Sequence, residues 1–375
     1  MNAPFPIAHD TAGARVQIGG KPANAKLWRP KQVVITRDAR SYAHGLAMAQ
    51  RCSDAGLEVR ELSSNAVRMP RDLSQRAAYA LAKQTLAITT APASKLRLQP
   101  IAPSADWRLD LAQGCPAHCA YCYLAGSLKG PPITRAYANI EEIFDAARAH
   151  EGQGTITSHS ADRAHEGTTY EASCYTDPLA IEPLTGSLAW MVERFGAWEA
   201  QVQLRFTTKY ADVATLLNLP HNGRTRMRAS VNPAAYAPFE AGTDKVADRL
   251  AGLAAMARAG YPVGLTIAPI IAAEGWEQAY ATLIDDAAAL LCPIPGLDLT
   301  VELITHRFTE GSRAVLQSWY PGSKLDMSEE RRTIKRTKFG TQKTVYDRET
   351  MAALKTFFYE RINAVLPEAR ILYWT

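Results

Sequence analysis

The chain has 375 residues, of which 47% are hydrophobic and 21% charged, and its 42 basic and 37 acidic side chains leave a formal net charge of +5. This composition excludes disordered, collagen-like and low-complexity proteins and predicts a globular chain with a substantial core. Its six cysteines are too few for a disulfide scaffold. We read no secretory signal and no apolar run of the roughly 20 residues that span a bilayer, so we expect a cytoplasmic protein with no membrane partner.

The first 105 residues predict a small α/β unit behind a polar lead. Residues 1–30 are polar and lack periodicity, which is typical of a flexible terminus. Within 31–105, the runs KQVVIT and LEVREL predict strands on either side of a helical stretch at 41–56.

Residues 106–308 alternate apolar runs with helical patterns. Six runs predict strands, at 106–111, 168–174, 202–207, 226–231, 263–270 and 297–304. Strands and helices in this order predict an α/β fold with a parallel sheet and right-handed crossovers, and six units predict an incomplete (β/α)₆ TIM-like barrel. Function in such barrels lies at the carboxyl ends of the strands. The stretch GTITSHSADRAHEG, at 154–167, is expected to be a mobile polar loop.

The carboxyl-terminal part, 309–375, breaks this rhythm and predicts a hairpin, a helix near 348–366 and a last strand, ILYWT. Its segment RRTIKRTKFGTQK, at 331–343, holds six basic residues and no acidic one, so the rest of the chain is nearly neutral. Cations interleaved with an aromatic residue suit a hairpin that grips DNA phosphates beside an extruded base. Charge alone also suits a solvated loop.

Three cysteines follow the first barrel strand in the motif GCPAHCAYCYL, which places Cys115, Cys119 and Cys122 in a CxxxCxxC spacing. A four-iron cluster normally takes four thiolates, so three leave one iron open for a cofactor. The alternative is a structural zinc site with His118 as the fourth ligand. The aromatic Tyr121 before the third cysteine favours iron, because the motif then resembles that of the radical S-adenosylmethionine superfamily, which implies a [4Fe-4S] cluster and S-adenosyl-L-methionine.

Longer stretches resemble the spore photoproduct lyase family, from about residue 32 to the end of the chain. They include TTYEASCYTDPLAIEPLTGSL, LRFTTKY, HNGRTRMRASVNP, AGYPVGLTIAPIIAAEGWEQAY, VELITHRFT and ILYWT. The resemblance implies a radical lyase that reverts the DNA lesion 5-thyminyl-5,6-dihydrothymine to two thymines through a 5′-deoxyadenosyl radical and a cysteine hydrogen donor. It implies two partners, DNA containing a thymine photoproduct and an unidentified electron donor.

The same resemblance implies roles for individual residues. Cys174 is the hydrogen donor, and Tyr121 and Tyr123 return a hydrogen to it. The residues that contact the cofactor are Lys209, Ser230, Thr176 and Tyr121. The residues that contact the lesion or the duplex are His306, Arg307, Lys338, Phe339 and Lys343.

Two departures from the family pattern leave the substrate open. Where the family has Trp-Gly followed by Arg and Tyr, this chain has Arg336, Thr337, Lys338 and Phe339, and Tyr175 is bulkier than the small hydroxyl residue expected beside Cys174. One alternative is therefore a radical enzyme that acts on another pyrimidine lesion or nucleic acid. A second alternative is a zinc-stabilised DNA-binding protein without redox activity.

Overall fold

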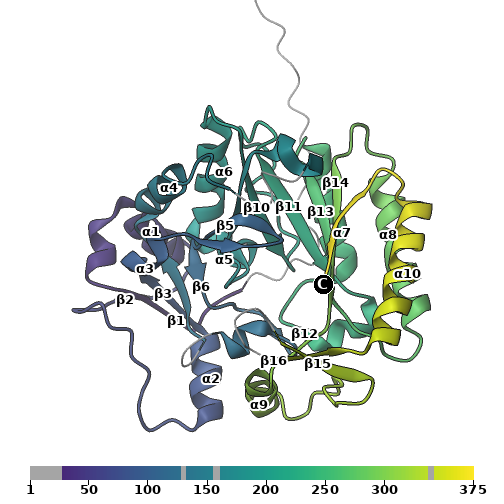
Figure 1. The fold of residues 1–375 in the computed structure, drawn as a ribbon. Helices are drawn as coiled ribbons and strands as arrows, with labels where there is room; N and C mark the ends of the chain where they lie inside the picture. The colour runs from purple at the N-terminus through teal and green to yellow at the C-terminus, as the bar shows by residue number, and fades with distance from the viewer. Residues whose placement is uncertain (1–27, 128–131, 155–160, 337–341) are drawn as a thin grey trace, which may run out of the picture.

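A computed structural model of the chain describes residues 28–127, 132–154, 161–336 and 342–375. A curled sheet forms the centre of the molecule, with a smaller α/β unit at one side and a pair of long helices at the other (Figure 1). The hairpin and two short helices lie below the sheet in this view, on the side where the cysteine motif is found.

The central sheet has eight strands in the order β17-β14-β13-β11-β10-β9-β5-β4. The six strands predicted for the barrel are parallel to one another: β5 (Ala105–Leu109), β9 (Thr168–Ala172), β10 (Val202–Thr208), β11 (Thr225–Val231), β13 (Val263–Ile270) and β14 (Leu299–Thr305). β4 (Gln99–Ile101) adds an antiparallel edge, and β17 (Arg370–Trp374) pairs in parallel with β14. The linear strand order confirms the predicted incomplete barrel, and each predicted strand is present.

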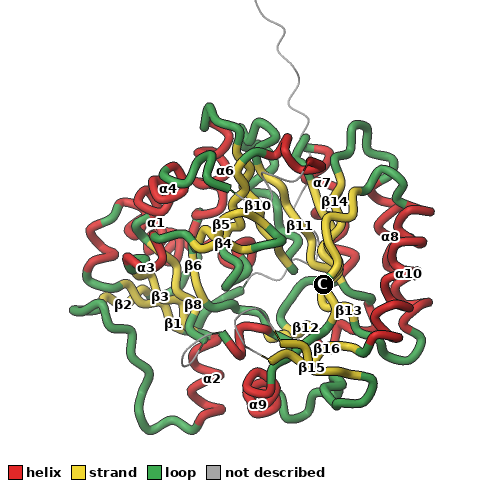
Figure 2. Tube along the Cα trace, in the orientation of Figure 1, coloured by secondary structure: helices red, strands yellow, loops and turns green. Residues whose placement is uncertain are grey.

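Helices cover the outer face of this sheet, as the red segments of Figure 2 show. They are α5 (Pro178–Thr185), α6 (Ser187–Ala197), α7 (Val246–Arg258), α8 (Trp276–Leu291) and α10 (Arg348–Val365). Every second residue along a strand faces these helices. Leu204 and Phe206 on β10, for example, are fully buried in the apolar layer between the sheet and the helices. This layer supplies most of the hydrophobic stabilisation of the barrel.

The opposite face of the same strands is buried but charged. Arg205, Arg226 and Arg228 are 0%, 0% and 1% exposed. Arg228 pairs with Glu171 of β9, and Arg205 pairs with Glu166. Because buried charges are tolerated only when paired, these side chains fix one another and fill the barrel interior.

The expectation of a mobile polar loop at 154–167 is wrong for its described part. Residues Ala161–Glu166 form a short 3₁₀ helix, η3, in which Arg163 and Glu166 are buried. Arg163 donates to Glu166 at 2.8 Å and to the Pro103 carbonyl at 3.0 Å. The insertion therefore contributes Glu166 to the charged barrel interior, where it pairs with Arg205. His159 lies outside the described residues.

The small unit has a five-stranded sheet in the order β2-β1-β3-β8-β6. Its strands are β1 (Gln32–Ile35), β2 (Val59–Glu61), β3 (Thr85–Thr89), β6 (Ala112–Gln113) and β8 (Thr134–Tyr137), and its helices are α1 (Ala43–Asp54), α2 (Gln75–Lys83) and α3 (Ala93–Leu96). The next helix, α4 (Ile140–Arg148), packs instead on the barrel, where the Tyr170 hydroxyl of β9 donates to the Ala147 carbonyl at 2.9 Å. Two of these strands, β6 and β8, come from beyond residue 105. The cysteine motif lies in the connection between these two strands.

After β14 come α9 (Glu310–Trp319) and the antiparallel hairpin of β15 (Arg332–Arg336) and β16 (Gln342–Tyr346). The hairpin is joined to the end of β14 by a bridge between Phe308 and Thr344. Among the described residues, no helix has the length and apolarity needed to cross a membrane.

Candidate active site

The cysteine motif forms a loop that is tied to the barrel on two sides. Its short strand β7 (His118–Cys119) pairs with β12 (Glu240–Ala241), so that Cys119 lies opposite Glu240. At the start of the loop, Gly114 has φ of 84°, and its N–H donates to the Tyr175 carbonyl at 2.9 Å. A Cβ there would lie 2.2 Å from the Ile133 carbonyl oxygen, so only glycine fits.

The three cysteines of the loop are free thiols, and Cys119 is buried. Burial raises the pKa of Cys115 to about 12 and raises that of Cys119 further. Buried thiols of this kind ionise only when a bound metal compensates the thiolate charge, which suits an iron–sulfur cluster.

The arrangement does not favour the zinc alternative. In the described part of the chain, no three His, Cys, Asp or Glu side chains are grouped to hold one metal ion. A four-iron cluster binds each cysteine at a different iron, so its cysteines stand farther apart than the ligands of one zinc ion.

The predicted cofactor residues Lys209, Ser230 and Tyr121 are brought together beside the loop. The Lys209 ammonium, at the end of β10, donates to Ser230 Oγ at 2.8 Å and lies 5.5 Å from the centre of the Tyr121 ring. Two of them, Lys209 and Tyr121, also bond to Glu240, a residue that the sequence analysis missed. Lys209 donates to Glu240 Oε1 at 2.8 Å, and the Tyr121 hydroxyl donates to the same oxygen.

Glu240 is a buried anion held by two cations. Arg249 of α7 binds its second oxygen at 2.6 Å, and Asn232 donates to the first at 3.1 Å. Burial acts to raise the pKa of Glu240, but the charges of Lys209 and Arg249 outweigh it and bring the pKa to about 2. The carboxylate is therefore ionised at neutral pH and fixes the Lys209 ammonium at the strand end.

Thr176, another predicted cofactor residue, lies on the turn before α5. Its Oγ1 atom is buried and has no hydrogen-bond partner among the described residues. The next residue, Asp177, accepts from the Lys209 backbone N–H at 2.7 Å. A buried hydroxyl without a partner fits a polar cofactor that would complete its hydrogen bonding.

Cys174 lies in a tight turn at the end of β9. The preceding residue, Ser173, has φ of 59°, and its backbone N–H donates to the Leu109 carbonyl at 2.8 Å. Burial raises the pKa of Cys174 to about 12. At neutral pH the side chain is therefore an S–H group, which is the form that can donate a hydrogen atom.

The two predicted relay tyrosines lie on different sides of Cys122. The Tyr123 hydroxyl donates to the Cys174 carbonyl, and its ring centre is 6.4 Å from that of Tyr175. Tyr121 instead bonds to Glu240, on the cofactor side. Tyr123 therefore contacts the backbone of Cys174, and Tyr121 contacts the cofactor residues.

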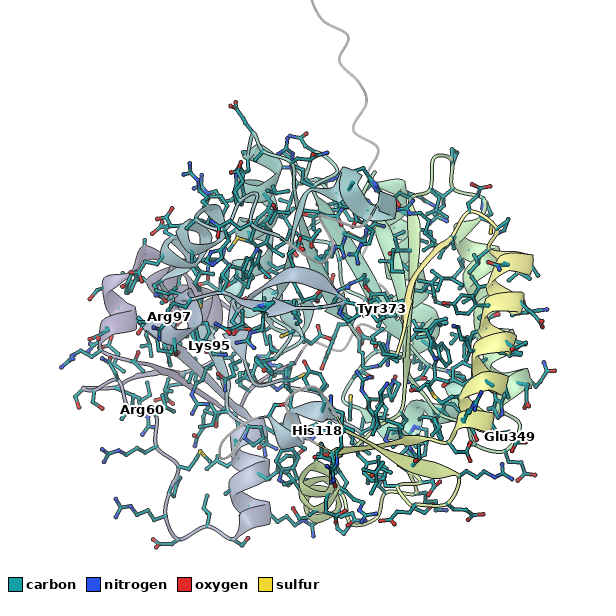
Figure 3. The ribbon with its side chains drawn as sticks, viewed as in Figure 1. Arg60, Lys95, Arg97, His118, Glu349 and Tyr373 are labelled. Atoms are coloured by element: carbon teal, nitrogen blue, oxygen red, sulfur yellow. The ribbon has the colours of Figure 1, made fainter. Side chains whose placement is uncertain are left out.

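Tyr175 is held by charged residues that the sequence analysis did not identify. Arg108 and Lys95 lie 4.7 and 4.8 Å from the centre of its ring, and Arg108 also donates to its hydroxyl at 3.1 Å. Both cations pair with the buried Asp110. Figure 3 shows Lys95 on the side of the small unit and His118 near the hairpin.

The predicted DNA contacts divide into three groups. Arg307 is exposed and Lys343 is half-buried. Burial lowers the pKa of Lys343, and the charge of Arg307 lowers it further, because the two cations are neighbours. His306 is 2% exposed, and its Nδ1 lies 3.1 Å from the guanidinium of Arg332, the first residue of the hairpin. Its ring is therefore packed against the hairpin and is not accessible to DNA. Lys338 and Phe339 lie outside the described residues.

The half-barrel, the cysteine loop after its first strand and the thiol after its second define a class of protein, the radical S-adenosylmethionine enzymes. The family described as spore photoproduct lyase matches residues 28–375. The spore photoproduct lyase of Bacillus subtilis (strain 168) is 36% identical over 349 residues, which cover 92% of this chain and 98% of that protein. That of Geobacillus sp. (strain Y412MC61) is 37% identical over 93% of this chain and 100% of its own length.

Solved structures agree with these relatives. A spore photoproduct lyase double mutant with bound AdoMet and dinucleoside spore photoproduct has a TM-score of 0.84 and 36% identity, over 93% of this chain and 100% of that one. A spore photoproduct lyase complexed with dinucleoside spore photoproduct has a TM-score of 0.83 with the same coverage. This chain belongs to the spore photoproduct lyase family.

Proposed function

We propose that this protein repairs DNA by reverting 5-thyminyl-5,6-dihydrothymine to two thymines. One observation carries the proposal: the rim of the half-barrel holds the cysteine loop, the Lys209–Glu240 pair and the Cys174 thiol within one connected site. A DNA substrate would place the protein in the cytoplasm.

Each part of the site has a role in this reaction. The cluster and S-adenosyl-L-methionine, when bound, supply the group that removes a hydrogen atom from the lesion. Cys115, Cys119 and Cys122 would hold the cluster, and the Lys209 ammonium would meet the carboxylate of the cofactor.

Cys174 would complete the repair of the lesion. After the bridge between the thymines breaks, the S–H bond of Cys174 breaks and a C–H bond forms on the thymine allyl radical. The sulfur keeps one unpaired electron. Tyr123 would return a hydrogen atom to that sulfur, and Tyr121 would in turn restore Tyr123. Tyr121 would recover its own hydrogen atom from 5′-deoxyadenosine, which carries the one taken from the lesion, so that Cys174 and both tyrosines end unchanged.

DNA binding is expected to depend on the cation pair Arg307 and Lys343. Each phosphate contact releases counterions, so replacing both residues by Ala should reduce the slope of log affinity against log salt by about two. Binding of a lesion-free duplex, measured by fluorescence anisotropy at several salt concentrations, checks this. Lys355→Ala on α10 is the matched control, and a slope equal to that of the wild type in the double variant would count against this DNA-binding surface.

A lesion panel tests the proposed function directly. The anaerobically reconstituted protein is given cofactor, reductant and, separately, the isolated spore photoproduct, a cyclobutane thymine dimer and the (6–4) product. We expect thymine release from the spore photoproduct alone. Turnover of another lesion without turnover of the spore photoproduct would reject the proposal.

One observation favours a second candidate, a radical enzyme for a different pyrimidine product. Tyr175 places a bulky ring next to Cys174, and the clamp of Arg108 and Lys95 keeps it there. The Tyr175 ring would leave less room for the substrate beside Cys174, which would suit a lesion of a different shape. The same panel distinguishes the two candidates.

A further inference from the structure

Lys83, the last residue of α2, reaches out of the small unit and into the cysteine loop. Its side chain is buried, with the residue 4% exposed. The ammonium donates to the Cys115 carbonyl at 2.6 Å and also to the Ala117 carbonyl. A helix outside the barrel therefore places a cation against the backbone of the first residues of the cysteine motif, Cys115 and Ala117. Figure 1 shows α2 below the sheet, next to α9.

The charge of Lys83 has no carboxylate partner in the described part of the chain. The other lysines near the site are paired, Lys95 with Asp110 and Lys209 with Glu240. A buried ammonium that is bonded only to carbonyls is costly unless negative charge lies nearby. Three thiolates that hold an iron–sulfur cluster would supply that charge, because their sum exceeds the positive charge of the cluster core.

Reduction of such a cluster adds one more negative charge to the site. The potential of an iron–sulfur cluster depends on net charge, hydrogen bonds and exposure, so a buried cation nearby stabilises the reduced state. A unit charge about 10 Å from a redox centre, at an effective dielectric constant of about 20, changes the equilibrium by about tenfold or more.

We propose that Lys83 is a positioning residue that holds the cysteine loop through two carbonyls and raises the reduction potential of the cluster through its buried charge. The inference rests on the proposed function, because it requires the cluster. It assigns to the small unit a role in setting how readily the enzyme accepts its electron, although Lys83 contacts neither the cofactor-binding lysine nor the thiol.

Three variants separate the charge from the hydrogen bonds. Lys83→Met removes both, Lys83→Gln keeps a donor without the charge, and Lys83→Arg keeps the charge. Lys355→Met, at an exposed position on α10 across the molecule, controls for the loss of any single cation. Each full-length protein is reconstituted anaerobically, assayed for iron and sulfide, and titrated with reductant in the absence of DNA while electron paramagnetic resonance reports the reduced cluster.

We expect the Met and Gln variants to show an at least tenfold lower ratio of reduced to oxidised cluster at a fixed poise, a shift of about 59 mV for one electron. The Arg variant and the Lys355 control should titrate like the wild type. If the Met variant does not retain iron, the difference in reduction potential between the Gln and Arg variants tests the role of the charge. A Gln variant with the reduction potential of the wild type would overturn the proposal that the Lys83 charge raises this potential. A wild-type protein that binds no cluster would instead overturn the proposed function.

Discussion

Replacement of Cys174 by Ala is expected to leave cleavage of S-adenosyl-L-methionine intact and to lower the yield of two clean thymines by about 10²-fold, the order of effect when a single positioned hydrogen-transfer group is lost. The methyl group of Ala has no weak bond to hydrogen, so the thymine allyl radical remains unquenched. Aberrant thymine adducts should accumulate instead. Chromatography of the products, together with quantification of 5′-deoxyadenosine, measures both quantities.

Cys174→Ser is a sharper version of the same test. A hydroxyl keeps the branching of the thiol and an exchangeable hydrogen. Its O–H bond is too strong to donate a hydrogen atom to a carbon radical, so the Ser variant should fail like the Ala variant. Cys292→Ala is the matched control, because this free thiol lies on the surface beside the Val365 carbonyl. Clean repair by the Ser variant would exclude Cys174 as the donor.

Replacement of Glu240 by Ala is expected to lower the free energy of unfolding by about 3–5 kcal/mol, because it leaves the cations of Lys209 and Arg249 buried without their shared partner. It should also loosen the cysteine loop, since β12 carries both Glu240 and the pairing with Cys119. Urea denaturation of the protein without cluster measures the first effect. Glu310→Ala, at an exposed ion pair, is the control and should change stability by less than about 1 kcal/mol.

The pH dependence of stability gives an independent check on Glu240. Its pKa in the folded state is about 2, below the ordinary value of 4.5, so its contribution is fully present above pH 4.5 and is lost as the pH falls towards 2. The difference in unfolding free energy between wild type and Glu240→Gln should therefore shrink over that range. A difference that stays constant with pH would show that the carboxylate charge does not stabilise the fold.

The sequence predicted the residues that end barrel strands and missed those that reach the site from elsewhere. Lys209 and Ser230 were named from the family resemblance, and both lie at the carboxyl ends of predicted strands, which a parallel sheet brings together. Glu240 lies on a two-residue strand in a connection, and no periodicity marks it. Lys83 ends a helix of the small unit, and only the packing of that unit against the barrel reveals its contact.

The charged interior of the barrel is a second feature that the sequence pattern did not predict. Arg205 and Arg228 alternate with apolar residues on their strands, which is also the pattern of a strand with one face in water. The structure shows that both faces are buried, because Glu166 of the insertion and Glu171 of β9 neutralise these arginines. Such pairing between distant segments is not visible in a local pattern, and the described part of the insertion was misassigned for this reason.

The central claim, that the Cys174 thiol completes repair of the spore photoproduct, is tested most directly by repair of the isolated lesion in D₂O. Thiol protons exchange with solvent, so the sulfur carries deuterium before the reaction begins. The account predicts release of two thymines with one deuterium in the methyl group of the thymine that receives the hydrogen. Release of thymines without deuterium, or no release at all, would contradict it.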